Sequence, residues 1–395
     1  MNVDVAVVGL GLIGSAALRY LTDTDLHVVG IGPEEPADLA THQGPFASYY
    51  DSGRVTRRID TRREWAVLAS RSIAEYGILE QRSSMRFHSP SGFIFVRNDA
   101  QGIAHQKAVA AELGIPITLG TAADRQPAGL IFPDGFTTLS EPSPAGHIDP
   151  RGLVAAQLRI AEAQGANVLR STVSSVQKIK GGFEVRCGPT TLRAEQLLVA
   201  TGSYGNDLLP EPLAMSVRPE AVILAEVAQS IEDMPAVICL LESSHYNDVY
   251  LVPPVRYPDG HTYLKMGGSS RTVRPFSTSE ERHAWMSGGQ ADAQLGNMRA
   301  IMESFLPNQE FLSWGMKPCL IADTVSGMPY IDQIDKGWFV AVGGNGHAAK
   351  SSDAIGALAS SFISEESWID SELEQSEFAA IFGKFSPGEE SRHGN

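Results

Sequence analysis

The chain has 395 residues, of which 43% are hydrophobic and 19% charged, a composition typical of soluble globular proteins. Its formal net charge of −15 argues against nucleic acid or an anionic membrane surface as a partner. The three cysteines provide no disulfide framework. With no apolar run of about 18 residues and no room for a signal peptide, we expect a cytoplasmic protein.

Residues 4–21 predict a strand, a tight glycine turn and an amphipathic helix in the sequence DVAVVGLGLIGSAALRYL. Gly9 makes the turn, Gly11 lets the backbone approach a pyrophosphate, and Gly14 lets the helix pack closely on the strand. The helix N-terminus then faces the phosphates with the positive end of its dipole. This segment predicts a dinucleotide site and by itself leaves NAD and FAD both open.

One part of this dinucleotide-binding pattern is missing. An acidic residue is expected about 20 residues on, at the end of the second strand, to bind a ribose. Here that strand reads HVVGIG and ends at Gly32, with Glu34 and Glu35 just beyond. We expect the ribose to be held by Glu34, by Glu35 or by the backbone.

Helices are expected next at 62–77, 102–113 and 151–165, the last one starting at Asp149-Pro150. Strands are expected at 91–96 and 196–202. The second of these strands also ends in a turn of small residues, which we interpret as a second approach to the same cofactor.

Residues 218–285 carry alternating, β-branched and aromatic segments, which are typical of an antiparallel sheet. Residues 287–305 are expected to be helical, and residues 338–363 predict a strand, a glycine-rich turn and a long helix. The polar tail from residue 386 is expected to be disordered. Cofactor-type elements therefore lie at the start, middle and end of the chain, with a β-rich region inserted.

Seven segments occur in the order found in one flavoenzyme family: VVGLGLIGS, SYYDSGRVTRR, EPSPAGHIDP, VATGSYGNDL, YLKMGG, MKPCLIADT and GGNGHAAKSS. From residue 3 to about residue 380, the chain resembles the D-amino-acid-oxidase-like FAD enzymes, most closely the monomeric sarcosine oxidase and N-methyltryptophan oxidase branch. The resemblance implies FAD as cofactor and an α/β fold of two domains. These are a Rossmann-like FAD-binding domain, expected at 1–85, 145–215 and 315–385, and an inserted antiparallel β-sheet substrate domain, expected at 86–144 and 216–314.

Cys319 follows Lys317-Pro318 and precedes Thr324, where members of this branch carry a cysteine joined through sulfur to the flavin ring. The resemblance therefore implies a covalent flavin at Cys319. Such a thioether raises the potential of the flavin and prevents its loss. The alternative is a plain buried cysteine, which is our interpretation of Cys187 and Cys239.

Lys265, in YLKMGG, corresponds to a lysine that activates dioxygen in the relatives. A fixed positive charge in a site of low dielectric stabilises the negative charge that forms as O2 is reduced. The alternative is a lysine that extends from a strand edge into solvent.

Arg54 and Arg57 match the Arg-x-x-Arg spacing of the family, and Lys350 lies in GHAAKSS. The resemblance implies that Arg57 and Lys350 bind the substrate carboxylate, to which arginine offers a planar fork and lysine a point charge. Arg54 is expected nearer the flavin ring, where it would tune its electronics. The alternative is a solvated basic face, and Arg58 is the residue most easily mistaken for Arg57.

Tyr250, in VYLVP, matches a tyrosine of the substrate pocket, although an aromatic in a strand is as often part of the core. The turn at 343–347 is expected to direct backbone N–H groups and a helix dipole to the pyrimidine end of the flavin, with His347 either taking part or serving as a structural histidine. The remaining cofactor contacts are expected at Leu12, Ile13, Ser48, Val173, Thr201, Gly202, Gly344, Asn345, Gly346 and Lys350.

Two further departures from the family concern the substrate pocket. Sarcosine-oxidising relatives have a histidine where this chain has Ser269, and a tyrosine where it has Ile321. A different or bulkier amine than sarcosine is therefore expected.

The resemblance implies an FAD-dependent amine oxidase acting on a secondary amine or N-substituted amino acid. Hydride passes to the flavin, the imine is hydrolysed, and O2 reoxidises the flavin to give H2O2. The alternatives are a dehydrogenase of the same fold with another electron acceptor, an NAD(P) dehydrogenase, and a non-catalytic flavin-binding subunit. We expect a monomer that has a small-molecule substrate and no metal, nucleic-acid or membrane partner.

Overall fold

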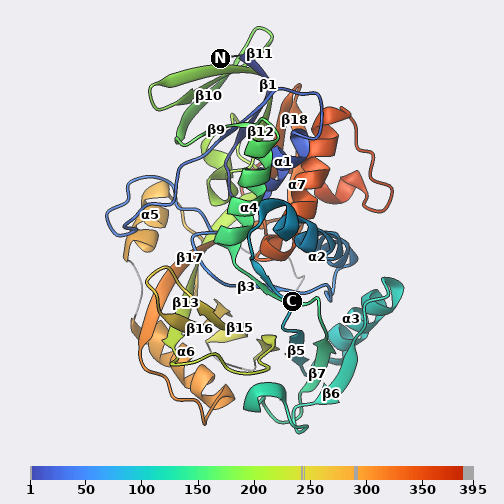
Figure 1. The fold of residues 1–395 in the computed structure, drawn as a ribbon, viewed down its shortest axis with the longest axis vertical. Helices are drawn as coiled ribbons and strands as arrows, with labels where there is room; N and C mark the ends of the chain where they lie inside the picture. The colour runs from blue at the N-terminus through green and yellow to red at the C-terminus, as the bar shows by residue number, and fades with distance from the viewer. Residues whose placement is uncertain (1, 242, 244, 289–291, 386–395) are drawn as a thin grey trace.

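The computed structural model describes residues 2–241, 243, 245–288 and 292–385. Figure 1 shows a sheet flanked by helices in the upper half and a second, largely antiparallel sheet in the lower half, with chain segments crossing between them. The expected α/β class with two sheet-based units is confirmed. The expected disordered tail at 386–395 lies outside the described residues.

The upper sheet is built on five parallel strands, three of which are buried along most of their length. They are β9 (Asn167–Leu169), β2 (Val28–Ile31), β1 (Asn2–Val8), β12 (Thr190–Val199) and β19 (Trp338–Val342), in that spatial order. Antiparallel strands extend the sheet as β10 (Val173–Ile179), β11 (Gly182–Cys187) and β18 (Tyr330–Asp335). Burial on both faces explains why residues 5–8 are all apolar and do not alternate.

Helices α1 (Leu12–Leu21), α2 (Arg63–Ser83), α4 (Pro150–Ala163) and α7 (Ala348–Ser364) pack against one another beside this sheet. A Cβ added at Gly356 of α7 would lie 2.6 Å from Ala16 Cβ of α1, so the two helices approach closely only because that residue is glycine. Arg19 of α1 ties the layer together: its buried guanidinium lies 2.9 Å from Asp353 Oδ1 of α7.

The lower sheet has the spatial order β17 (Trp314–Thr324), β13 (Met215–Glu226), β16 (Thr262–Ser270), β15 (Tyr246–Arg256), β14 (Ala236–Leu240), β5 (Phe93–Arg97), β7 (Thr137–Glu141) and β6 (Thr118–Thr121). All neighbours are antiparallel except β14 and β5. Around it lie α3 (Ala100–Glu112), α5 (Ser279–Gly288) and α6 (Asp292–Phe305), of which α6 packs on β13 and β16.

A small third sheet lies where the two halves meet. It consists of β3 (Arg54–Thr56), β8 (Gly146–Ile148) and β4 (His88–Ser89). Short 3-10 turns complete the described chain at Pro127–Gly129, Gly202–Asp207 and Gln375–Phe378. Because β3 follows directly on residues 48–53, this sheet holds the SYYDSGRVTRR segment between the two larger sheets.

The main difference from the sequence-based expectations concerns residues 315–324. We expected them in the FAD-binding domain, but they belong to β17, which pairs with β13 along nearly its whole length in the lower sheet. Residues 218–285, which include most of β13, were expected as an antiparallel sheet, but backbone pairing between strands about 100 residues apart leaves no local signal in one sequence, so β17 and its pairing with β13 were not predicted. Helix α5 was likewise not expected as a separate helix before α6.

None of the helices in the described ranges has the length and apolar character needed to cross a bilayer.

Candidate functional site

A cavity of about 730 Å³ lies along the edge of the upper sheet, a size in the range of cofactor sites. It extends from the glycine turn after β1 to β17 and to the turn before α7. The expected cofactor residues that line it are Gly9, Gly11, Leu12, Ile13, Ser48, Arg54, Val173, Thr201, Gly202, Cys319, Gly344, Asn345 and Gly346. Gly14, His347 and Lys350, also expected as cofactor contacts, do not line it. Ile321, expected in the substrate pocket, also lines it. The cavity therefore brings together segments from the start, middle and end of the chain.

The glycine turn meets the steric requirements of a dinucleotide site. Gly9 has φ +99°, and a Cβ there would lie 2.6 Å from the Ala200 carbonyl oxygen. A Cβ at Gly14 would lie 1.8 Å from the Gly9 carbonyl oxygen, whereas the nearest atom at Gly11, Tyr49 Cδ1, is 3.9 Å away. Gly9 and Gly14 are thus required by packing, while Gly11 leaves the backbone open to a ligand.

Helix α1 is prepared for an anion at its N-terminus. No side chain caps it, and no acidic residue lies in its first turn. Its free N–H groups and the positive end of its dipole thus face the cavity. Beside the glycine turn, the buried Thr201 Oγ1 lines the cavity and has no hydrogen-bond partner among the described residues. These donors fit the pyrophosphate and the polar groups of FAD.

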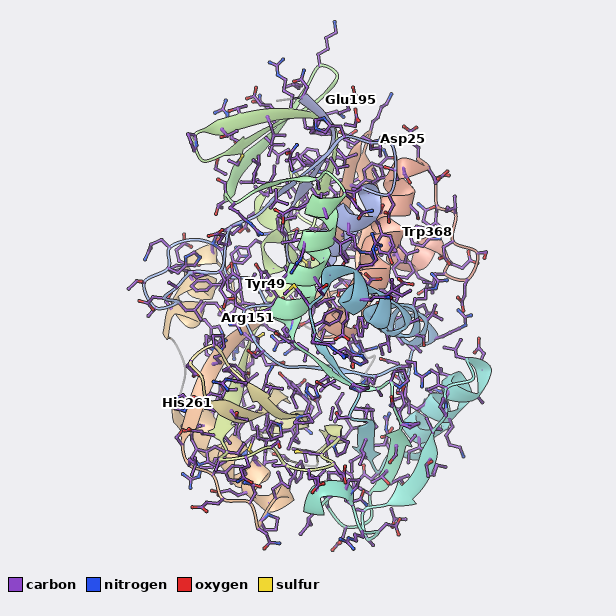
Figure 2. All side chains as sticks on the ribbon, viewed as in Figure 1. Asp25, Tyr49, Arg151, Glu195, His261 and Trp368 are labelled. Atoms are coloured by element: carbon purple, nitrogen blue, oxygen red, sulfur yellow. The ribbon has the colours of Figure 1, made fainter. Side chains whose placement is uncertain are left out.

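The structure explains the glycine at the end of β2. A Cβ at Gly32 would lie 2.9 Å from Leu10 N and 3.0 Å from Leu10 Cβ, so the fingerprint turn itself occupies the space an acid would need. Glu34, one of the residues expected at the ribose, is exposed and does not line the cavity. Glu35 forms a two-pronged ion pair with Arg151, at 2.6 and 2.7 Å. Figure 2 shows Arg151 and Tyr49 near the middle of the molecule, between the two sheets.

We therefore expect Gly32→Asp to lower the free energy of unfolding and not to improve FAD binding. The new side chain would overpack the turn at Leu10, which costs about 1–3 kcal/mol in the free energy of unfolding. Chemical denaturation of the apoprotein measures this. Gly77→Asp is the matched control, because Gly77 is exposed and has open space around its Cα. Equal stability of the two variants, with tighter FAD binding by Gly32→Asp, would contradict the packing argument.

The turn before α7 is held by its own side chains. Asn345, with φ +49°, accepts a hydrogen bond from Thr324 N at 2.8 Å and donates to the Gly343 carbonyl at 2.6 Å. A Cβ at Gly343 would lie 2.1 Å from Thr324 Cγ2. The turn and β17 are therefore fitted to each other, and Gly344, Asn345 and Gly346 form one wall of the cavity.

At the β17 end of the cavity, a buried ionic group surrounds Asp51. Lys265 Nζ lies 2.6 Å from Asp51 Oδ2 and donates to the Gly53 carbonyl at 2.8 Å. Arg54 also donates to Asp51 Oδ2, and Tyr257 donates to Oδ1 at 2.7 Å. Arg54 Nη2 lies 3.6 Å from Cys319 Sγ. Lys265 is fully buried and does not line the cavity, so its link to the cavity runs through Asp51 and Arg54.

The buried charges of this group perturb one another. Burial, with the guanidinium of Arg54 close by, lowers the pKa of Lys265 well below its ordinary value. The ion pair with Asp51 favours the charged form and opposes that change. Burial and the charge of Arg151 lower the pKa of Lys317, whose ammonium donates to the Tyr50 carbonyl, to about 8.

Tyr250 and Ser269 lie on the same part of the lower sheet, but neither lines the cavity. Tyr250 donates to Glu220 Oε1 at 3.2 Å, and its ring lies 5.4 Å from Lys265 Nζ. Burial raises the pKa of the Glu220 carboxyl, against the opposing charge of Arg218. Ser269 donates to Asp248 at 3.3 Å. Glu220 lies opposite Cys319 in the pairing of β13 with β17.

Arg57 and Lys350 are brought together, as the resemblance implies, but on a carboxylate of the chain itself. Arg57 Nη1 lies 2.8 Å, and Lys350 Nζ 3.0 Å, from the same oxygen, Asp60 Oδ2. His347 Nδ1 lies 3.3 Å from that oxygen, and the His347 ring stacks on Trp65 with centroids 5.0 Å apart. Arg57, Asp60 and Lys350 are each at most 4% exposed, so they do not form a solvated basic face.

Sequence reasoning missed the two carboxylates that organise these groups, Asp51 and Asp60. Asp51 lies within the SYYDSGRVTRR segment and Asp60 two residues after it. The segment was therefore singled out from the sequence, but the cations that pair with these two carboxylates could not be predicted. Glu280 and His283 of α5, which line the cavity, were also missed. Among the described residues, no group of three or more His, Cys, Asp or Glu side chains is arranged to hold a metal ion.

Comparison with known proteins identifies one family. The model of the family described as "FAD dependent oxidoreductase" matches residues 4–361. A monomeric sarcosine oxidase of Streptomyces avermitilis is 26% identical over 212 residues, which cover 53% of this chain and 54% of that enzyme. The match thus spans about half the length of this curated relative.

Solved structures show the same fold. NikD, an unusual amino acid oxidase essential for nikkomycin biosynthesis, has a TM-score of 0.78 at 20% identity, covering 96% of this chain and 98% of NikD. The glycine oxidase from Geobacillus kaustophilus has a TM-score of 0.71 at 16% identity, covering 96% of this chain and 98% of the other. At these identities the likeness concerns the fold.

Proposed function

This chain belongs to the FAD-dependent oxidoreductase family, and on that premise we propose that it oxidises the C–N bond of a secondary amine or N-substituted amino acid, with O2 as the final electron acceptor and H2O2 as product. The names of the sarcosine oxidase and glycine oxidase above support the choice of an amine substrate. Bound FAD supplies the electron acceptor for this oxidation.

The observation that carries the proposal is the buried ionic group at the β17 end of the cavity. Asp51 holds Lys265 and Arg54 together, and Arg54 reaches Cys319 on the cavity wall. Two cations share the one carboxylate of Asp51, so this carboxylate does not offset all of the positive charge at this end of the cavity. Burying a charged side chain costs free energy of desolvation unless an opposite charge compensates it.

In this proposal Lys265 holds a positive charge close to the place where O2 is reduced. Its ammonium is fixed by Asp51 and by the Gly53 carbonyl, so it needs no rearrangement as negative charge develops. Arg54 places a second positive charge at the cavity wall.

We further propose that Cys319 binds the flavin covalently. It is the cysteine whose side chain lines the cavity, whereas Cys187 and Cys239 are buried elsewhere in the two sheets. Arg54 Nη2 lies 3.6 Å from its sulfur, so a cation stands beside the atom that would form the bond to the flavin. The other proposed cofactor contacts are the cavity-lining residues named above.

Two measurements on the purified holoenzyme test the function. Anaerobic mixing with a panel of secondary amines and N-methyl amino acids should bleach the flavin with at least one of them. Readmitting air should restore the colour and release one H2O2 per amine oxidised. Bleaching without peroxide identifies a dehydrogenase, and the absence of bleaching with every amine identifies a non-catalytic flavoprotein.

A further inference from the structure

Asp60 lies where two buried cations converge, and both of its oxygens are bound. Its Oδ2 lies 2.8 Å from Arg57 Nη1 and 3.0 Å from Lys350 Nζ. Its Oδ1 accepts from the backbone N–H groups of Thr61, at 2.8 Å, and Arg62, at 3.3 Å. The carboxylate is 3% exposed.

These residues, which we call the Asp60 cluster (Arg57, Asp60, His347 and Lys350), lie directly behind the cavity wall. Lys350 is in the first turn of α7, next to Ala348 and Ala349, which line the cavity. Arg57 follows β3, three residues after the cavity-lining Arg54, and its guanidinium lies 5.6 Å from the rings of Phe93 and Phe95 in β5. The cluster therefore lies between the cavity and the lower sheet.

The surroundings of the cluster favour one anion. A lysine in the first turn of a helix is opposed by the helix dipole, whereas a carboxylate there is stabilised by it. The charges of Lys350 and Arg57 also favour the ionised carboxylate. They hold the pKa of the Asp60 carboxyl well below its usual range despite its burial. The adjacent Arg58 does not compete, because it pairs with its own carboxylate, Glu141, at 2.7 Å.

We propose that Asp60 fills, from within the chain, the carboxylate-binding position made by Arg57 and Lys350, so that the amine oxidised here carries no carboxylate. This rests on the proposed function and narrows its substrate class to secondary amines with uncharged substituents. A substrate carboxylate would have to displace Asp60 and leave it unpaired beside a second negative charge. Breaking a buried ion pair in this way is strongly unfavourable.

Matched amines test the substrate class. Pyrrolidine and proline differ only in the carboxylate, as do N-methylphenethylamine and N-methylphenylalanine, and each amino acid is supplied as both enantiomers. We expect the amine of at least one pair to bleach the wild-type holoenzyme anaerobically about 100-fold faster than its amino acid, or more, at equal concentration. An amino acid that bleaches as fast as its matched amine, or faster, overturns the proposal.

Replacement of Asp60 supplies a readout that does not depend on turnover. Asp60→Ala leaves Arg57 and Lys350 without a carboxylate, so acetate should raise the melting temperature of this variant by about 2–4 °C above an equal concentration of chloride. Wild type should not respond to acetate. In the same variant the preference for amine over amino acid should fall about tenfold or more. The absence of a specific acetate response in Asp60→Ala, or an equal response in wild type, overturns the proposal.

Two further variants keep this test decisive. Asp60→Asn keeps the size of the side chain and removes its charge, so it replaces the alanine variant if that variant does not fold. It should also reduce the preference for amine over amino acid. Asp353→Ala breaks a different buried ion pair, with Arg19, on the same helix, and should leave the preference unchanged. If no amine of either class bleaches the flavin, the proposed function fails, and the acetate response alone then decides whether Asp60 fills an anion site.

Discussion

Replacing Lys265 with methionine is expected to slow the reaction of the reduced enzyme with O2 by about 100- to 1000-fold, the usual effect of removing one preorganised electrostatic contact. Methionine nearly preserves the length and the apolar stem of lysine and removes only the charge. Because Lys265 is fully buried and fixed by Asp51 and the Gly53 carbonyl, its charge is already held in place before O2 is reduced. Stopped-flow mixing of substrate-reduced enzyme with oxygenated buffer measures this rate.

The rate of anaerobic reduction by substrate separates this role from a structural one. It should change little in Lys265→Met, since the lysine does not line the cavity. Lys178→Met is the control for the same chemical change on the surface, where Lys178 pairs with Asp335 and is half exposed. Equal losses in the reductive and oxidative steps would mean that Lys265 only holds Asp51 in place, and an unaltered O2 rate would remove it from the mechanism.

Replacing Cys319 with serine is expected to release all of the flavin that the wild-type protein retains after acid precipitation. A thioether survives denaturation, whereas noncovalent FAD is lost with the fold. Serine is close in size to cysteine, so the cavity wall should remain intact and FAD should still bind before denaturation. The measurement is the flavin absorbance of the acid pellet and of the supernatant.

The other two cysteines are matched controls for this experiment. Cys187 in β11 and Cys239 in β14 are buried and lie outside the cavity lining, and burial raises the pKa of the Cys239 thiol to about 12. Cys187→Ser and Cys239→Ser should both keep the flavin in the pellet. Flavin that stays in the pellet with Cys319→Ser, or that is already soluble from wild type, rules out the covalent link at this position.

The arrangement of the site limits how these effects combine. Arg54 contacts both Asp51 and the Cys319 sulfur, so the two variants act on parts of one hydrogen-bonded group. Residues that share a partner do not contribute additively. The effect of the double variant on the oxidative step should therefore differ from the product of the effects of the two single variants.

The sequence alone determined the cofactor class and the course of the chain around it. The glycine spacing after β1, the small-residue turn after β12 and the strand, turn and helix at 338–363 are local signals. Their meaning does not depend on distant residues, because a tight turn or a helix N-terminus is made by consecutive residues. This is why Gly9, Thr201 and Asn345 were predicted at the positions where they line the cavity, whereas Cys319 was predicted only from the family resemblance.

The tertiary structure alone decided which charges meet. Asp51 and Lys265 are 214 residues apart, and Asp60 and Lys350 are 290 apart, so no spacing rule connects them. The same holds for β17, which finds its place only by pairing with β13, and for Gly32, whose missing side chain is explained by Leu10. An ion pair or a steric conflict depends on distances of a few ångströms in space. Only folding brings these groups within that range, and it places Asp60, where a substrate carboxylate was expected, on Arg57 and Lys350.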